Sequence, residues 1–205
     1  MLYKIAHFVK DHLTFMWDVI EWGNSAIFSI VNCKKLAVLN DVIKSVSNEY
    51  IFRLATIEDT DMLLQFFKEQ PESSFCFFKP HGFDENSIKK IIKNKAFLTF
   101  VVTKDNTIVG YFFLRCFING KCFRGKIVHK EWQGRGIAKL MGVAMTRVSL
   151  FLKMRMFGSI SPDNFASFAS AKASNNIKVH KILENGYYYI EFLPKTLNTK
   201  ELYIQ

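Results

Sequence analysis

The segment from Ala96 to Lys130 constrains the fold of this chain more than any other. It reads AFLTFVVTKDNTIVGYFFLRCFINGKCFRGKIVHK, three runs rich in β-branched and aromatic residues that are joined by KDNT and by NG. Such runs are typical of β-strands, and Asn-Gly between two of them is among the strongest short signals for a hairpin. The segment therefore predicts three consecutive antiparallel strands.

Helical and strand patterns alternate on both sides of these strands. Upstream, YIFRLAT indicates a strand, and IEDTDMLLQFFKEQ and SIKKIIKNK indicate helices separated by the loop PESSFCFFKPHGFDEN. Downstream, the patterns predict a long helix from Ile137 to about Met154, a strand FGSIS, a helix beginning at PDNFAS, and a hairpin in which Asn185-Gly186 joins IKVHKIL to YYYIEFL. This order predicts an α+β (mixed α/β) fold.

Residues 1–48 are expected to form a helical N-terminal extension, with residues 49–205 as the main domain. Leu2, Ile5, Val9, Leu13, Met16 and Ile20 follow helical spacing on one face. Gly23-Asn24-Ser25 is expected to break this run, with a second helix from Ser25. We expect the apolar face to pack on the main domain or on a second subunit in a homodimer. A peripheral membrane contact is the alternative, because Trp17, Trp22 and nearby basic residues suit an interface.

Length, composition and charge limit the classes of function. The chain has 205 residues, 49% of them apolar, which suits one well-packed globular domain with an appendage. The formal net charge of +10 indicates an anionic partner. Because no block of like charges and no interleaving of aromatic and basic residues occurs, we favour a phosphorylated ligand over nucleic acid.

Cysteine usage and the N-terminal charges favour a cytoplasmic protein. A two-residue turn at Asn119-Gly120 would pair Phe117 with Cys122 and Cys116 with Phe123, which disfavours a disulfide between the two cysteines. The spacing of the four cysteines suits no zinc site, so no metal is expected. Lys4, Lys10 and Asp11 stand where a signal peptide needs apolar residues. The uncharged stretch from Trp22 to Cys33 is shorter than the ~20 residues of a membrane span.

The stretch QGRGIA at residues 133–138 lies between a predicted strand and the long helix. A glycine-containing turn that opens a helix directs backbone N–H groups and the positive end of the helix dipole at one point, which favours an anion. Gly134 and Gly136 permit a tight turn and close approach of a ligand, and Arg135 and Lys139 add positive charge. The dinucleotide fingerprint fails because residue 139 is Lys, and no Gly-Lys-Ser/Thr of a P-loop occurs.

The pattern Gln133-x-x-Gly136-x-Ala138 resembles the acetyl-CoA signature of the GNAT N-acetyltransferase superfamily, R/Q-x-x-G-x-G/A. FRLATIEDTDMLLQF, TIVGYFFLR, IVHKEWQGRGIAKLM and SISPDNFAS also resemble successive elements of that family, over about residues 50–195. The resemblance implies the GNAT fold, with a mostly antiparallel twisted sheet of about six to seven strands, and acetyl-CoA as cosubstrate. It further implies acetyl transfer to a small-molecule amine.

The overall pattern is similar to acetyltransferases linked to surface-polysaccharide synthesis, which favours an amino sugar or sugar nucleotide as acceptor. A protein or peptide acceptor is the nearest alternative. A CoA-binding module without transfer activity is another, because the family's usual Tyr, seven residues after Asn164, is here Ala171. In the family that Tyr protonates the leaving thiolate.

The resemblance also assigns roles to residues. The loop that would hold the pyrophosphate of the coenzyme comprises Gln133, Gly134, Arg135, Gly136, Ile137, Ala138 and Lys139. The main chain near Ile127 and Val128 would pair with the pantetheine arm, because strand splaying leaves these groups unpaired. Asn164 and Ser167 match an N-x-x-S pattern near the coenzyme.

Catalytic residues are less constrained by these patterns. His81 is the first candidate for general base, since its pKa class suits proton removal near neutrality, although a loop histidine often only bonds locally. Glu131 and His129 are second candidates, and Tyr187 is a candidate acid together with its neighbours Tyr188 and Tyr189. Lys89, Lys90 and Lys93 are most simply the solvated face of a helix, with contact to the 3′-phosphate of the coenzyme as the alternative.

Overall fold

The structure is a computed structural model that describes residues 14–195, with side chains described from residue 19 onward. Within this range the core is a seven-stranded sheet in the order β1-β2-β3-β4-β5-β7-β6. Neighbouring strands are antiparallel except β4 and β5, which are parallel. The strands are β1 Ile51–Leu54, β2 Phe97–Lys104, β3 Thr107–Cys116, β4 Lys121–Val128, β5 Arg155–Ile160, β6 Asn175–Ile182 and β7 Tyr188–Pro194. The predicted mostly antiparallel sheet is confirmed.

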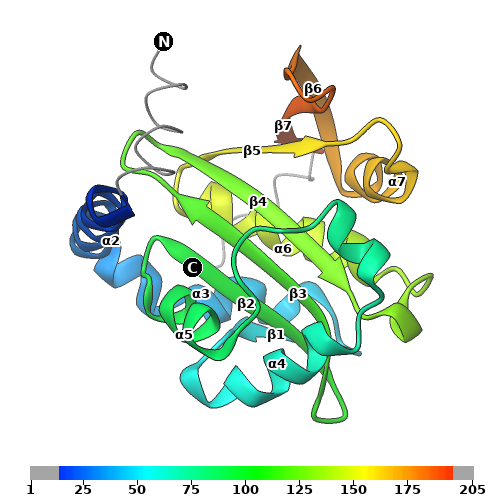
Figure 1. Ribbon diagram of the computed structural model, residues 1–205, viewed down its shortest axis with the longest axis horizontal. Helices are drawn as coiled ribbons and strands as arrows, with labels where there is room; N and C mark the ends of the chain where they lie inside the picture. Colours follow the sequence, from blue (N-terminus) through cyan, green and yellow to red (C-terminus); the bar gives the residue numbers. More distant parts are fainter. Residues whose placement is uncertain (1–13, 196–205) are drawn as a thin grey trace.

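Helices cover both faces of this sheet. Figure 1 shows α4 and α5 in front of the sheet and α6 behind it. The helices are α2 Thr14–Ala37, α3 Leu39–Ile43, α4 Thr60–Lys68, α5 Glu85–Lys93, α6 Ile137–Phe151 and α7 Phe165–Ser174. None of those in the described range is both long and apolar enough to span a membrane. α6 ends three residues before the predicted Met154, because Lys153 adopts a left-handed φ of +59° that a helix cannot continue.

Alternation along the central strands builds two separate core clusters. Phe100 and Phe112 stack with ring centroids 4.8 Å apart in the cluster on the α6 side. Their neighbours Val101 and Tyr111 belong to the cluster under α4 and α5. Because β2 and β3 are covered on both faces, they read as continuous apolar runs.

The predicted break at Gly23-Asn24-Ser25 is wrong, since α2 runs through it without interruption. The Asn24 side chain donates to the Cys116 carbonyl at 2.9 Å and accepts from the Ile118 N–H at 3.2 Å, and Ser25 Oγ accepts from the Lys95 N–H. Asn and Ser disfavour helix when they bond to their own backbone. Here both bond to distant segments instead, so the helix continues.

The C-terminal half of the extension packs into the main domain. Phe28, Leu39 and Ile43 are buried in the same cluster as the sheet residues that face α6. Leu2, Ile5, Val9 and Leu13 of the predicted apolar face, and the side chain of Met16, lie outside the described residues. The treatment of residues 1–48 as an appendage stays a proposal.

The predicted register of the β3–β4 hairpin is wrong by one residue. Cys116 lies directly opposite Cys122, because the loop has three residues rather than two and Gly120 takes a left-handed φ of +74°. The Phe117 N–H donates to the Lys121 carbonyl at 2.9 Å and closes this loop. Both cysteines are buried free thiols. The pairing register of β3 and β4 therefore gives no argument against a disulfide between Cys116 and Cys122.

Candidate active site

β4 separates from β5 halfway along its length. Lys121–Phe123 pair with Arg155–Phe157, and from Arg124 onward β4 is paired only with β3 among the described residues. From Gly158 onward β5 is paired only with β7. Figure 1 shows the two strands diverging toward their carboxyl ends. The edge of β4 that includes Ile127 and Val128 therefore has main-chain groups with no strand partner, as the predicted pantetheine contact requires.

The glycine-containing loop follows the unpaired part of β4. Gly134 and Gly136 both have a φ of +78°, and no other atom lies within 4 Å of the position that a Cβ would take at either. Gly136 is the N-cap of α6, a helix of 15 residues. The N–H groups of Arg135, Gly136, Ile137 and Ala138 have no backbone acceptor in the described range. The loop thus presents unpaired donors at a helix N-terminus, which suits an anion.

Solvent reaches this loop and its cations. Gln133, Gly134, Arg135, Gly136 and Lys139 are exposed, whereas Ile137 is buried in the core and Ala138 is half-buried. The Arg135 guanidinium lies 4.6 Å from the centroid of the Trp132 ring, which holds the charge beside the loop. The loop residues predicted from the sequence therefore lie together at one end of α6.

Two further cations, Arg124 and Lys126, lie on the α6 side of the unpaired half of β4, and sequence reasoning missed both. Arg124 donates to Asn175 Oδ1 at 2.9 Å, and its guanidinium stacks on Phe192 at 3.3 Å from the ring centroid. Lys126 Nζ donates to the Ala138 carbonyl at 2.6 Å. Burial lowers the pKa of Arg124 to about 9 and, together with Arg124, lowers the pKa of Lys126 well below its ordinary value.

His81 lies inside an aromatic cluster on the opposite face. Its Nδ1 is 2.6 Å from the Gly82 carbonyl and its Nε2 is 2.7 Å from the Tyr111 hydroxyl. Nδ1 therefore carries the proton, and Nε2 accepts from Tyr111. Burial lowers the pKa of His81, and the rings of Phe67 and Phe83 pack against it. Both nitrogens are occupied, which favours a packing role for this side chain.

His129 forms a pair with Glu69 at the end of β4. His129 Nε2 lies 2.9 Å from Glu69 Oε2, and its Nδ1 accepts from the Glu131 N–H at 3.3 Å. His129 is buried, whereas the Glu69 side chain is 44% exposed. Hydrogen bonds from Gln65 and then from His129 lower the pKa of Glu69. Glu69 was missed because 60 residues separate it from His129 in the sequence.

The remaining predicted site residues are spread over two elements and a turn. Asn164 is the N-cap of α7, and its Oδ1 accepts from the Ser167 N–H at 3.0 Å. Ala171 is buried two turns further along α7. Tyr187 lies in the β6–β7 turn, where its N–H donates to Asn185 Oδ1. Glu131 is exposed beside His129.

Of the lysines on α5, Lys89 forms an exposed ion pair with Glu85, and Lys90 and Lys93 are exposed. These positions agree with a solvated helix face. A role of these lysines toward the 3′-phosphate stays a prediction.

The sheet face opposite α6 carries aromatic and charged side chains next to the separation of β4 and β5. The Phe157 and Tyr189 rings stack with centroids 5.4 Å apart, and Phe123 lies 6.2 Å from Phe157. Beside them Glu191 accepts from Arg155 at 2.7 and 3.0 Å and from His180 at 2.8 Å. Arg155 above all, with His180, lowers the pKa of Glu191 to about 2.

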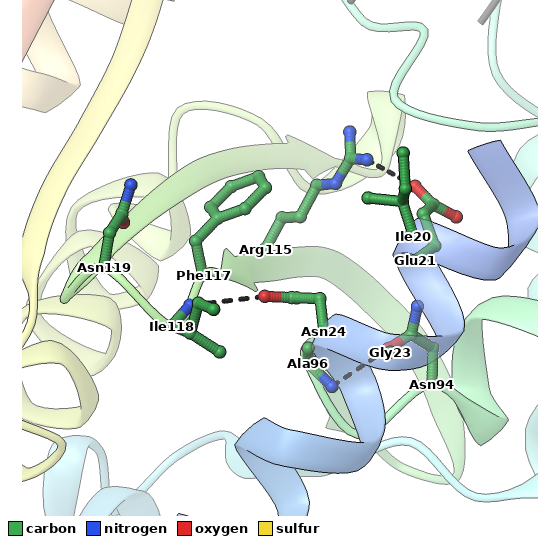
Figure 2. Close-up of a pocket in the computed structure, with 10 residues that line it drawn as sticks. All are labelled: Ile20, Glu21, Gly23, Asn24, Asn94, Ala96, Arg115, Phe117, Ile118 and Asn119. Carbon is green, nitrogen blue, oxygen red and sulfur yellow. Dashed lines mark hydrogen bonds and ion pairs between the residues drawn. The ribbon is translucent and has the colours of Figure 1, made fainter. Parts of the chain in front are cut away.

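A groove of about 400 Å³ lies at the other end of β4, between α2 and the β3–β4 hairpin. Figure 2 shows Asn24 directed at Ile118, and Glu21 paired with Arg115. Its lining residues are Ile20, Glu21, Gly23, Asn24, Asn94, Ala96, Arg115, Phe117, Ile118 and Asn119. Because these contacts tie the helix to the hairpin, the groove belongs to the attachment of α2 and not to the loop at Gly136.

The described residues contain no group of three or more His, Cys, Asp or Glu side chains placed to hold a metal ion. No protein-family model matches the sequence, and no curated protein matches it.

Solved structures, in contrast, share the fold. The GNAT domain of S. lividans PAT is 15% identical with a TM-score of 0.60, over 69% of this chain and 88% of that one. Mycobacterium smegmatis RimJ in complex with CoA-disulfide is 14% identical with a TM-score of 0.60, over 75% and 83%. AAC(6')-Ib in complex with paromomycin and acetyl-CoA is 10% identical with a TM-score of 0.57, over 72% and 94%. The chain therefore has the GNAT fold.

Proposed function

We propose that this protein is an N-acetyltransferase that transfers an acetyl group from acetyl-CoA to a primary amine. The observation that carries the proposal is the exposed loop at Gly136, whose unpaired N–H groups adjoin the unpaired edge of β4. A pyrophosphate and a chain of amides need these two kinds of group side by side. Proteins of the same fold bound to CoA or acetyl-CoA support the assignment.

The residues at this site fit acetyl-CoA. Gly134 and Gly136 leave the loop backbone open to a phosphate, and Arg135 and Lys139 supply positive charge beside it. The main chain at Ile127 and Val128 would pair with the pantetheine amides, and Asn164 and Ser167 would border the coenzyme from α7. Acetyl-CoA supplies the activated acyl group, and the chain holds it in one orientation.

The acceptor amine must lose a proton to become nucleophilic, so a general base is needed beside it. We look for this base on the face of the sheet opposite α6. We assign this role to the pair of His129 and Glu69. It lies at the end of β4 and presents a partly exposed carboxylate, whereas His81 has both nitrogens bonded within the aromatic cluster. Glu131 and Tyr187 remain secondary candidates.

A small-molecule amine, with an amino sugar or sugar nucleotide favoured, is the proposed acceptor. The half-buried Tyr189 ring lies beside the separation of β4 and β5 and is backed by the buried Phe157 ring. It supports a sugar-containing ligand, because the apolar C–H face of a sugar ring packs on an aromatic face. A panel of sugar amines, amino acids and peptides is incubated with acetyl-CoA and analysed by mass spectrometry. Acetylation of sugar amines is expected, and products from peptides alone would contradict the choice.

A CoA-binding module without transfer activity is the alternative from another class, motivated by Ala171. It predicts that CoA raises the thermal unfolding temperature while no amine in the panel releases a thiol. Thiol release with any amine would exclude it.

We also propose that α2 docks on a membrane surface. Its exposed face carries large apolar side chains, which is typical of an interaction surface. The exposed fractions are 50% for Val19, 73% for Trp22, 48% for Ile27, 76% for Ile30 and 73% for Val31. Co-sedimentation with anionic liposomes tests this: Trp22→Ser with Ile30→Ser should reduce pelleting several-fold. Equal pelleting of the wild-type protein and the double variant would contradict the membrane contact. A dimer of the wild-type protein that the double variant does not form would also contradict it.

A further inference from the structure

Lys126 is a mostly buried cation with no acidic partner among the described side chains. Its ammonium has three N–H donors, and one of them binds the Ala138 carbonyl at 2.6 Å. Neither Lys126 nor Arg124 forms an ion pair with a carboxylate among the side chains of residues 19–195. A buried charge without a counterion is costly, so such a residue persists where it serves an anion.

Arg124 differs from Lys126 in being held by its own partners. Its guanidinium bonds to Asn175 and lies flat on Phe192, and Asn175 in turn donates to Thr146 Oγ1 at 2.7 Å. The two cations therefore have different tasks. Arg124 ties β4 to β6 and β7, and Lys126 keeps donors available beside the unpaired edge of β4.

Lys126 lies near the segment of α7 that contains Ala171. Its Nζ lies 3.8 Å from the place that a Cβ would take at Gly142 on α6, and the Ser174 side chain of α7 contacts that same glycine. Ser174 Oγ also donates to the Ala171 carbonyl at 3.3 Å. The ammonium thus reaches the α6–α7 contact about one helical turn from Ala171. The neighbours of Lys126 on α6 and α7 are the uncharged residues Ala138, Gly142 and Ser174. Arg124 is its charged neighbour on β4.

We propose that Lys126 stabilises and protonates the thiolate that leaves the acyl group, in place of a hydroxyl at position 171. The inference rests on the proposed transferase function. As the acceptor nitrogen bonds to the acyl carbon, the carbon–sulfur bond breaks and its electron pair leaves with sulfur. Lys126 donates one proton to that sulfur and becomes a neutral amine, which a proton from solvent restores. The proton lost by the acceptor nitrogen passes to the base on the opposite face.

The thiol of bound CoA reports this contact directly. Thiolate absorbance of the complex, corrected for the protein alone, gives the thiol pKa for wild type, Lys126→Met and Lys126→Arg. The methionine variant should raise that pKa by about one unit and lower kcat about 10- to 100-fold, with the KM for acetyl-CoA little changed. The arginine variant keeps the charge and should retain most of the thiol shift.

Lys172→Met is the matched control, because Lys172 is an exposed lysine next to Ala171 on α7. It should change neither the thiol pKa nor kcat. CoA bound to Lys126→Met with the wild-type thiol pKa would overturn the role of Lys126 and leave the transferase assignment standing. Failure of the wild-type protein to bind CoA would overturn both.

Discussion

The two halves of β4 are built for different purposes. Lys121–Phe123 are paired with β3 and β5, and the hairpin before them is tied to α2 through Asn24. Arg124–Val128 lack β5, carry two mostly buried cations and lead into an exposed loop. Satisfied main-chain groups stabilise the first half, and unsatisfied ones make the second half available to a ligand. One strand thus anchors the fold at one end and borders the proposed site at the other.

Two glycines allow a direct comparison of these ends. Gly120 in the hairpin and Gly136 at the helix start have φ values of +74° and +78°, and neither has an atom within 4 Å of its missing Cβ. Their backbone strain on substitution is therefore the same. The same substitution at both positions therefore separates an effect on the ligand from an effect of backbone strain.

The largest effect is expected at the loop. Gly136→Glu places bulk and negative charge where the unpaired N–H groups meet the phosphates, so CoA affinity should fall at least about 100-fold. Isothermal titration calorimetry measures this. Gly120→Glu is the matched control, with about 1 kcal/mol lost from the free energy of unfolding and unchanged CoA affinity. Equal loss of affinity in both variants would contradict the loop assignment.

Substitution of the proposed base should come next in size. Glu69→Gln removes the carboxylate and should lower kcat about 100-fold without changing CoA affinity. His81→Phe should instead cost about 1–2 kcal/mol of unfolding free energy by leaving the buried Tyr111 hydroxyl without its partner. Steady-state rates with the best amine, together with urea unfolding, separate the two. A rate loss confined to the His81 variant would reverse the assignment.

At the anchored half of the strand, substitution should affect stability alone. Asn24→Ala removes both hydrogen bonds to the hairpin and should lower the free energy of unfolding by about 2 kcal/mol. Asn32→Ala is the matched control, since the Asn32 side chain donates to the Phe28 carbonyl within its own helix, and it should cost about 0.5 kcal/mol. Urea unfolding measures both. Weaker CoA binding by the Asn24 variant would show that the two ends are coupled.

The smallest effect is expected from substitution of Glu191. Its carboxylate accepts hydrogen bonds from Arg155, the first residue of β5. Its pKa is lowered to about 2, so its contribution is complete above the unfolded pKa of about 4.3 and disappears as pH falls through about 2. Glu191→Gln should cost about 1–2 kcal/mol at pH 7. Thermal unfolding from pH 7 to pH 2 should show the two proteins converging. A constant difference across that range would exclude the ion pair as its cause.

Local signals were enough to predict much of the fold and the loop. The apolar runs, the two Asn-Gly turns and the glycines at 134 and 136 act within a few residues, and the elements that they predict are present. The break at Gly23 failed because Asn24 bonds to a hairpin 92 residues away. The register of Cys116 failed because Asn-Gly fits both two-residue and three-residue loops.

The proposed catalytic residues depend on contacts that no local pattern contains. His81 looked like a loop histidine, but folding places both its nitrogens in bonds to Gly82 and Tyr111. Sequence reasoning did not single out Lys126. The departure of β5 from β4 beside it becomes visible only in the folded structure.

The central claim is that the unpaired half of β4 and the loop after it bind CoA. Amide hydrogen exchange of the full chain with and without CoA tests this directly. We predict slower exchange for Arg135, Gly136, Ile137 and Ala138 and for the main chain near Ile127 and Val128, with no change around Asn24 and Ile118. Protection confined to the groove between α2 and the hairpin, with the loop unchanged, would contradict it.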